Sequence, residues 1–387
     1  MIKKKFVTLV TLIFIASIFP VSLIGASEGD DWALTIDGES LDLIPELEEY
    51  SWILDRPPYT PHDKIALRRL VKSGEEPIGV IFIFPGTWSS GDQLISDDVY
   101  CQYLEAIDAD EEEIEKLRNM VAEHSICHYL ALRGFDVYSI DYRTHFVPNT
   151  YTQDDLKFMK NWGWEMYMED AELSFDKAKE ISGEDKLFLG GESFGGMLAM
   201  NYASKHWEED LDGIVLLDGG TGGKPSRTCT MGMLPVPLPI PIGIPFLGLI
   251  LETIAHLAGM YALDIYEERD DAESQAFIAV TYDRYWPMQI YLEYMADVFR
   301  PRYKWDCGIW NRDYFNYYAN YKEIDVPLIA FISGFGLDFW GEYNPGIANQ
   351  DVTGYTYPDW SHHDIYGGTY NDEMVNEPTY QWLLDHL

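Results

Sequence analysis

The stretch that decides the fold runs Lys186-Leu187-Phe188-Leu189-Gly190-Gly191-Glu192-Ser193-Phe194-Gly195-Gly196-Met197-Leu198-Ala199-Met200. Its first part is a short apolar run, typical of a buried strand, and its last part has the composition of a helix. The pattern Gly-x-Ser-x-Gly lies between them, and its glycines would let the helix pass close to the strand. The alternative is a structural serine in a glycine-rich turn, which would need neither a strand before it nor a helix after it. The stretch therefore predicts a nucleophile, Ser193, exposed at the carboxyl-terminal edge of a sheet.

Similar apolar runs recur on both sides of this stretch and alternate with stretches of helical periodicity. The expected strands cover residues 78–84, 136–140, 186–190, 213–217, 326–332 and 353–357, and the expected helices cover residues 121–132, 164–181 and 197–204. Such alternation is typical of a doubly wound α/β core, whose parallel strands are buried on both faces. Residues 32–73 combine polar and aromatic residues with turn signals, so we expect a short antiparallel beginning of the sheet.

The alternation stops for about a hundred residues, where the chain becomes rich in proline and then helical and aromatic. Residues 233–242 hold too many prolines for a central strand, and residues 271–299 have the pattern of amphipathic helices. We interpret residues 221–322 as a helical cap inserted before the penultimate strand. The core would then consist of residues 27–220 and 323–387.

The N-terminus has the three parts of an export signal. A lysine-rich start precedes an apolar run over residues 6–24, and small residues follow at 25–27. We predict a signal peptide over residues 1–26 and a secreted or extracytoplasmic protein. The apolar run is nearly long enough for an uncleaved membrane anchor, so that alternative stays open. We expect no second crossing, because five prolines interrupt the other apolar candidate, residues 233–251.

Charge and cysteine usage narrow the range of partners. The sequence has 27 Lys and Arg against 65 Asp and Glu, a net charge of −38, which argues against a nucleic-acid partner. We attribute this acidity to solubility, for example in a salty medium. The four cysteines, Cys101, Cys127, Cys229 and Cys307, lack the spacing of a zinc site. In an oxidising compartment they could form up to two disulfides, by any of three pairings.

Taken together, the strands, the glycine-flanked serine and a near-terminal histidine resemble the α/β-hydrolase superfamily. The resemblance covers roughly residues 60–387 outside the cap. It implies that the backbone N–H of Phe194, directly after the nucleophile, is one oxyanion donor and that a loop after an early strand supplies the other. That loop reads Pro85-Gly86-Thr87-Trp88, without the common His-Gly start of the family. The resemblance implies Thr87 as the second donor, with Trp88 as the alternative.

The C-terminal region holds the candidate general base. His362 and His363 sit in the loop after the last expected strand, where the superfamily places this residue. The surrounding Trp360-Ser361-His362-His363-Asp364 resembles the end of acid lipases, where an Asn-His-x-Asp pattern carries the catalytic histidine. By that resemblance His362 is the base, Asp364 is a supporting acid, and His363 is the alternative base. A polar surface turn and, with less support, a metal-ligating pair are further interpretations.

Asp338 and Asp218 are the candidates for the acid of the triad. Asp338 follows the strand expected at 326–332, where the superfamily places its acid, and Asp218 ends the strand expected at 213–217. The acid would fix the imidazole tautomer and stabilise the imidazolium, although either aspartate could instead cap a helix. We favour Asp338. The serine, acid, histidine order then matches α/β-hydrolases and differs from the chymotrypsin and subtilisin types.

In this superfamily the cap overhangs the active site, so its composition bears on the substrate. Side chains that could line an acyl pocket are Met231, Met233, Leu234, Phe246, Leu247, Leu251, Trp286, Met288, Tyr291 and Tyr294. They favour hydrophobic esters, although helical aromatic stripes also arise from packing alone. We expect a small-molecule or lipid ester as substrate and no metal or organic cofactor. The N-terminal segment or the cap could associate with a membrane.

Two other functions are consistent with the sequence. The same residues would hydrolyse amides or transfer acyl groups, so a peptidase or an acyltransferase is the near alternative. A non-catalytic hydrolase fold that binds a partner at the cell surface is the alternative of another class. Such proteins usually lack the serine or the histidine, and this chain keeps a candidate for every role. The sequence therefore predicts an exported serine hydrolase of the carboxylesterase or lipase type.

Overall fold

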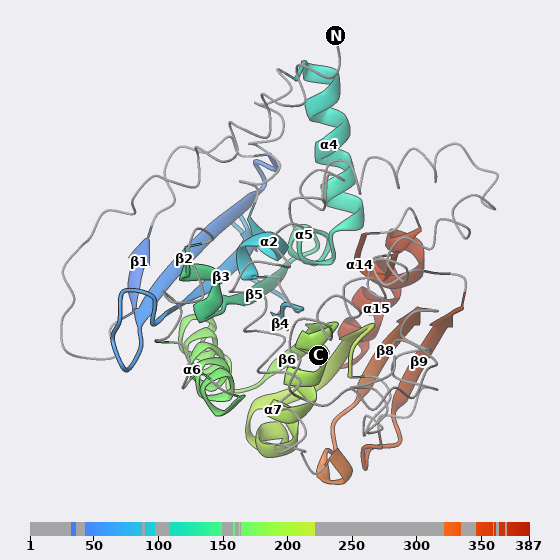
Figure 1. Cartoon of the computed structure of the whole chain (residues 1–387). Coiled ribbons are helices and arrows are strands. Elements are labelled where there is room, and N and C mark those ends of the chain that lie inside the picture. Colours follow the sequence, from blue (N-terminus) through green and yellow to red (C-terminus); the bar gives the residue numbers. More distant parts are fainter. Residues whose placement is uncertain are drawn as a thin grey trace, which may run out of the picture.

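One mixed sheet runs through the part of the chain that the structure, a computed structural model, describes (Figure 1). The described residues are 32–35, 43–86, 90–96, 109–148, 158, 162, 164–220, 321–333, 346–358, 360, 364–367 and 370–387. The predicted signal peptide lies outside them. So does the predicted cap, except for Tyr321 and Lys322.

The strands of the sheet alternate with helices along most of the chain. Their bounds are β1 (Ala33–Thr35), β2 (Leu47–Asp55), β3 (Lys64–Lys72), β4 (Gly79–Phe84), β5 (Phe135–Asp141), β6 (Leu187–Glu192), β7 (Leu211–Leu217), β8 (Leu328–Ser333) and β9 (Val352–Tyr357). Within the described residues the sheet order is β1-β2-β3-β5-β4-β6-β7-β8-β9. Neighbours are antiparallel from β1 to β5 and parallel from β5 to β9. The predicted doubly wound sheet is confirmed.

The central parallel strands are buried on both faces, as their sequences predict. Every residue of β5, β6 and β8 is buried, whereas β9, at the edge of the sheet, alternates between exposed and half-buried residues. The antiparallel beginning predicted over residues 32–73 is confirmed as β1 to β3. It is not uniformly short, because β2 and β3 have nine residues each.

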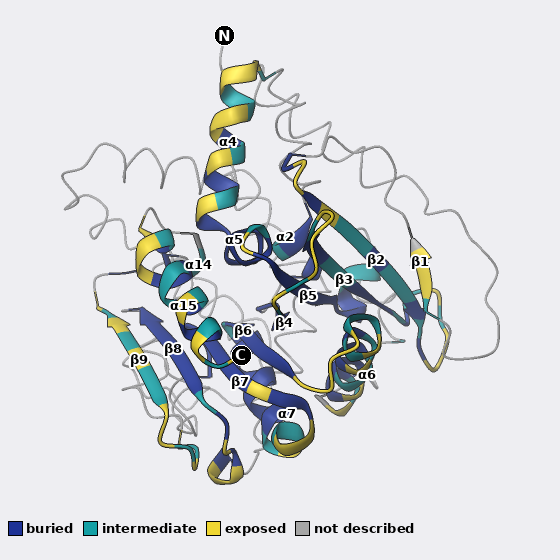
Figure 2. Cartoon of the chain, turned by 180° about the vertical axis from the view of Figure 1, so that it is seen from behind, coloured by how far each residue is buried: buried dark blue, intermediate teal, exposed yellow. Residues whose placement is uncertain are grey.

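Helices cover both faces of the sheet, and Figure 2 shows the buried strands between them. Their bounds are α2 (Gly91–Ile95), α4 (Glu111–His124), α5 (Ile126–Leu132), η1 (Arg143–Phe146), α6 (Trp164–Ser182), α7 (Phe194–Asp210), η5 (Tyr321–Glu323), α14 (Asp364–Gly367), η6 (Asp372–Asn376) and α15 (Glu377–Asp385). In the described part of the chain, no helix has the length and apolar character needed to cross a membrane.

Each face of the sheet has its own hydrophobic core. Helices α6 and α7 pack on one face, where Phe175 of α6 lies 5.5 Å from Phe82 of β4 between ring centroids. Helices α4, α5 and α15 pack on the other face, where Trp382 lies 5.9 Å from Phe188 of β6. Full burial of side chains of this size stabilises the fold by roughly 1.5–3 kcal/mol each. These two cores hold β4 and β6, the strands that lead to the candidate site.

The helix expected over residues 121–132 is wrong in one respect, because the structure has two helices there. Ser125 ends α4, with its N–H donating to the carbonyl of Val121 at 3.1 Å, and it also precedes α5 as the N-cap residue. Its hydroxyl lies 2.7 Å from His128 Nδ1. Serine competes for backbone and local polar partners, which favours helix ends over helix interiors.

The strand register brings several strand ends to one edge. Glu192 of β6 pairs with Leu217 of β7, Leu217 pairs with Phe331 of β8, and Phe331 pairs with Tyr355 of β9. Parallel strands in this register finish together at the carboxyl-terminal edge of the sheet. Open α/β sheets bind their ligands at this edge.

Candidate active site

Ser193 lies at the junction where β6 ends and α7 begins. Its φ of +49° and ψ of −118° place it in a left-handed region that residues with a side chain rarely adopt. Its N–H donates to the carbonyl of Leu217 at 2.9 Å, and its own carbonyl accepts from Gly196 at 3.1 Å. Ser193 is half-buried, while residues 191–192 and 194–200 are buried. The junction therefore leaves Ser193 as the accessible residue of a buried turn.

Close backbone contacts explain the glycines of the motif. A Cβ on Gly191 would overlap the backbone of Gly195 and Gly196. A Cβ on Gly195 would overlap the carbonyl of Phe84 and would lie 2.7 Å from the carbonyl oxygen of Pro85. Helix α7 therefore begins in contact with the ends of both β6 and β4. The sequence predicts that Gly191 and Gly195 let the helix pass close to the strand, and these contacts confirm that prediction.

Of the two predicted oxyanion donors, the structure describes Phe194 and does not describe Thr87. Phe194 is the first residue of α7 and is buried, directly after Ser193. Thr87 and the alternative Trp88 lie outside the described residues. Gly86, directly before them, is described, and its N–H donates to Glu192 Oε1 at 2.9 Å. Because the Gly86 amide is engaged by Glu192, Thr87 and Trp88 remain the candidate donors from this loop.

The predicted base and acid also lie outside the described residues, namely His362, the alternative His363, and Asp338. The strands before them are described: β8 ends at Ser333 and β9 ends at Tyr357. Both strands end at the edge where Ser193 lies, because β6 to β9 are parallel and in register. The roles of these residues therefore stay predictions.

Asp218, the alternative acid, follows β7 at the same edge. It is fully buried and has a φ of +49°. Its Oδ1 accepts from the N–H of Ser333 at 2.8 Å, and its Oδ2 accepts from the Ser333 hydroxyl at 2.5 Å. The carboxylate therefore ties the end of β7 to the end of β8. Asp364, the predicted supporting acid, is buried at the beginning of α14.

A buried carboxylate that the sequence reasoning missed anchors the far end of the loop after β4. Asp141 Oδ1 accepts from the Ser90 hydroxyl at 2.7 Å and from the N–H of Asp92 at 2.8 Å. Its Oδ2 accepts from Arg68 Nε at 2.8 Å. Burial by itself would raise the pKa of Asp141, but the charges of Arg68 and His145 lower it to about 2. The sequence does carry a signal for this anchor, because Asp141 is a charged residue at the end of a strand that is buried on both faces.

Asp92, Asp141 and His145 lie close enough to suggest a metal site, since one ligand atom from each falls within 4.8 Å of the others. The hydrogen bonds argue for another role. The Arg68 guanidinium already pairs with Asp141, and the two Asp141 oxygens accept three hydrogen bonds in all. A cation would have to displace these donors. We therefore assign the group as an ion-pair cluster that supports the loop.

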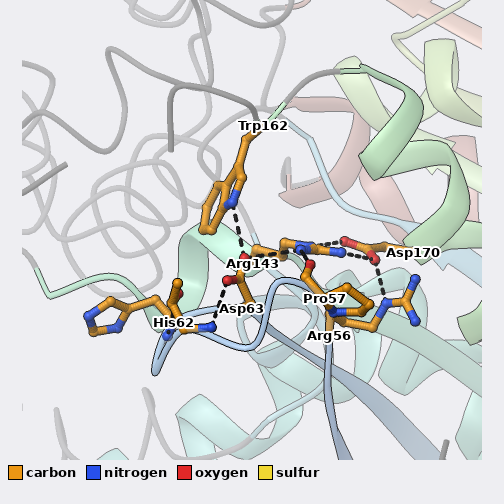
Figure 3. A network of polar contacts seen from close by, with 8 residues as sticks. Arg56, Pro57, His62, Asp63, Arg143, Trp162 and Asp170 are labelled. Atoms are coloured by element: carbon orange, nitrogen blue, oxygen red, sulfur yellow. Dashed lines mark hydrogen bonds and ion pairs between the residues drawn. The ribbon is translucent and has the colours of Figure 1, made fainter. Parts of the chain in front are cut away.

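A second network of buried polar contacts, shown in Figure 3, lies where the chain turns from β2 to β3 and where η1 follows β5. Arg143 of η1 donates to both carboxylate oxygens of Asp170 of α6, at 2.5 and 2.8 Å, and to Asp63 Oδ1 at 3.1 Å. Arg56 and the indole N–H of Trp162 donate to these same two carboxylates. The network joins the β2–β3 turn to η1 and α6. In the sequence, only the turn signals within residues 32–73 marked the β2–β3 turn.

Cys127 lies in α5 with a free thiol and is fully buried. Burial raises its pKa, and the nearby charge of Glu192 adds to the effect, so the thiol stays protonated at neutral pH. Each of the three two-disulfide pairings that the sequence left open includes Cys127. None of them, the pairing of Cys101 with Cys127 included, is therefore formed in this structure. Cys101, Cys229 and Cys307 lie outside the described residues.

Comparisons with known proteins fit this geometry. A family model described as serine aminopeptidase, S33, matches residues 119–236, which include the β6–α7 junction. A candidate lipase from Sulfolobus solfataricus, known by its crystal structure, is 23% identical, with a TM-score of 0.62 over 93% of this chain and 100% of that chain. Homoserine O-acetyltransferase from Bacillus anthracis is 11% identical, with a TM-score of 0.53 over 88% and 98%. No curated protein matches the sequence significantly. At these identities the likeness to the solved structures concerns the fold.

Proposed function

Because the chain has the α/β-hydrolase fold, we propose that it is an exported serine hydrolase that cleaves carboxylic esters of hydrophobic acyl groups. One observation carries the proposal: Ser193 is half-buried among buried neighbours at the β6–α7 junction, and its backbone has a positive φ of +49°. This is the conformation in which the fold exposes its nucleophile. The hydrolase description of the matching family supports the same class of activity.

The first half of the reaction forms an acyl-enzyme. Ser193 Oγ attacks the ester carbonyl carbon while His362 takes the hydroxyl proton. The negative charge that develops on the carbonyl oxygen is held by the amides of Phe194 and Thr87. The bond to the alcohol then breaks, and His362 returns the proton to the departing alkoxide. The acyl group remains on Ser193 as an ester.

The second half returns the enzyme to its starting state. Water enters in place of the alcohol, and His362 takes a proton from it as its oxygen attacks the acyl carbon. The same two amides hold the second oxyanion. The bond to Ser193 breaks, Ser193 recovers a proton from His362, and the carboxylic acid leaves. Asp338 keeps the imidazole in the tautomer that both halves require.

The preference for hydrophobic acyl groups rests on the composition of the proposed cap, residues 221–322. Its methionines, leucines and aromatic residues would provide an apolar pocket above the carboxyl-terminal edge. The export proposal rests on the lysine-rich start and the apolar run before residue 27. Mass spectrometry of protein recovered outside the cytoplasm checks the export proposal, since a cleaved signal would leave a chain that begins near residue 27.

Hydrolysis of p-nitrophenyl esters with acyl chains of two to sixteen carbons tests the activity. The variants are Ser193→Ala and His362→Ala, and Ser204→Ala on α7 is the matched serine control. We expect turnover in the wild type and in the control, with a preference for longer chains, and loss in the two site variants. A fluorophosphonate probe should label the wild type and leave Ser193→Ala unlabelled. A folded wild-type protein that neither turns over esters nor accepts the probe would contradict the proposal.

A peptidase is the second candidate, favoured by one specific observation: the family model that matches residues 119–236 is described as a serine aminopeptidase. The acyl-enzyme chemistry is the same, with an amine leaving in place of the alcohol. Aminoacyl p-nitroanilides tested on the same variants distinguish the two candidates. Serine-dependent turnover of anilides well above that of esters would replace the esterase proposal.

A further inference from the structure

The peptide unit between Pro85 and Gly86 is held at both of its polar ends. Its carbonyl, on Pro85, accepts from the hydroxyl of Tyr142 at 3.0 Å. Its N–H, on Gly86, donates to Glu192 Oε1 at 2.9 Å. Tyr142 and Glu192 are both buried, so water competes little for either bond. Two side chains from different parts of the chain therefore fix the plane of this peptide unit.

The fixed peptide unit lies beside the nucleophile. A Cβ built on Gly86 would lie 3.1 Å from Ser193 Cβ and 3.1 Å from Glu192 Oε1. The last paired residues of the parallel strands β4 and β6 are Phe84 and Gly191. Beyond that pair, the Glu192 side chain provides a link between the two chain segments. This link lies where the chain passes from β6 to Ser193 and where it passes from β4 into the following loop.

The far end of this loop is fixed as well. The Ser90 hydroxyl and the N–H of Asp92 both donate to Asp141, which pairs with Arg68. The described residues on either side of residues 87–89 are thus attached to the sheet. Gly86 is held by β6 through Glu192, and Ser90 is held by β5 through Asp141.

We propose that Glu192 is a positioning residue for the oxyanion hole, an inference that rests on the proposed function. Glu192 holds the Gly86 amide and so orients the peptide unit that precedes Thr87, the proposed second donor. Only the φ and ψ torsions of Gly86 separate the fixed unit from the Thr87 N–H. Glycine restricts these torsions less than any other residue, so the held unit alone would not orient the Thr87 N–H. The second attachment, at Ser90, supplies the missing restraint, because only three residues lie between the two held points.

The proposed role depends on the Glu192 oxygen that accepts from the Gly86 N–H. Two substitutions test this, because one removes the acceptor oxygen and the other keeps it. Glu192→Ala removes the acceptor, and loss of one oxyanion donor costs about 10²–10³-fold in kcat. A donor that is misplaced and not deleted should cost less, so we expect kcat to fall by about 10- to 100-fold with KM within about 3-fold. Glu192→Gln keeps an acceptor oxygen and should stay within about 3-fold of the wild type in both constants.

The experiment compares wild type, Glu192→Ala, Glu192→Gln and the exposed-glutamate control Glu184→Ala. Three quantities are measured: kcat and KM on a p-nitrophenyl ester, inhibition by an alkyl trifluoromethyl ketone, and hydrogen–deuterium exchange of the peptide that contains Gly86. The ketone forms a tetrahedral oxyanion with the serine, so its inhibition should weaken in parallel with kcat in Glu192→Ala. Exchange at Gly86 should speed up in that variant and stay slow in the other three.

Wild-type kinetics and unchanged exchange in folded Glu192→Ala would overturn the inference, and so would a loss in Glu192→Gln as large as in Glu192→Ala. If Glu192→Ala does not fold, Tyr142→Phe replaces it, because it frees the other end of the same peptide unit and should lower kcat in the same way. A wild type without Ser193-dependent turnover would contradict the proposed function. The exchange measurement would still decide whether Glu192 holds Gly86.

Discussion

Asp218, the residue after β7, accepts two hydrogen bonds from Ser333, the last residue of β8, and so joins the ends of neighbouring strands. Both bonds are short, at 2.8 Å from the Ser333 N–H and 2.5 Å from its hydroxyl, and Asp218 is fully buried. The segment that carries Asp338, the proposed acid, begins directly after Ser333. We therefore assign Asp218 to support of that strand end, and Asp338 stays the proposed acid of the triad.

Substituting asparagine for Asp338 and for Asp218, one at a time, distinguishes a triad acid from a residue that supports a strand end. Asp338→Asn should lower kcat by up to about 10⁴-fold with little change in stability, because the imidazole loses the partner that fixes its tautomer. Asp218→Asn should lower the free energy of unfolding by about 1–3 kcal/mol, because an amide must replace a buried carboxylate that accepts two hydrogen bonds. Its kcat should fall far less. Ester kinetics and urea unfolding of both variants give the comparison; the reverse pattern would make Asp218 the acid.

Gly195→Ala should destabilise the protein through the contact between α7 and β4. The added methyl group would overlap the carbonyl of Phe84, and overpacking of this kind costs about 1–3 kcal/mol or more. The exposed Lys205→Ala, also on α7, should change stability by about 0.5 kcal/mol at most. Urea unfolding of both variants checks the prediction. Equal stability of the two would show that the helix start can shift without cost.

Arg143→Met should be among the most destabilising single substitutions in the buried network. It would leave Asp63 and Asp170 without their main cation in a buried setting, and breaking such a pair costs about 3–5 kcal/mol. Lys72→Met, which breaks the surface pair with Glu75, is the control and should cost about 1 kcal/mol or less. Thermal unfolding of both variants distinguishes the cases. A loss for Arg143→Met as small as that of the control would argue against a role for the network in stability.

Asp141 should contribute pH-dependent stability. Its pKa is lowered to about 2 in the folded protein, whereas an unfolded aspartate titrates near about 3.9. The contribution, roughly 2–3 kcal/mol, is therefore fully present above about pH 4 and is lost as the pH falls through about 2. Asp141→Asn lacks it at every pH. The difference in unfolding free energy between wild type and Asp141→Asn should narrow as the pH falls from about 4 to about 2.

Urea unfolding across this pH range measures that difference. Asp55→Asn is the control, because Asp55 pairs with Lys64 at 3.3 Å while its side chain is 41% exposed. The control should show little narrowing, since solvent screens the pair. A difference for Asp141→Asn that did not change with pH would mean that the pairing with Arg68 does not hold this carboxylate in its charged form.

The local pattern of the sequence determined the alternation of strands and helices and the position of Ser193. Buried parallel strands need continuous apolar residues, and the tight turn at Ser193 needs glycines at fixed spacing, so both leave marks within a few neighbouring residues. The break at Ser125 was missed, because apolar periodicity continues through a serine that ends one helix and begins the next.

Only the tertiary structure decided which charged and polar groups meet. Asp218 and Ser333 are 115 residues apart in the chain, Gly86 and Glu192 are 106 apart, and Arg68 and Asp141 are 73 apart. Their contacts depend on the order and register of strands from separate parts of the chain, which no local pattern encodes. The sequence by itself therefore determined the position of Ser193, the proposed nucleophile, at the end of β6. The folded sheet decided which buried carboxylates hold the loop and the strand ends around it.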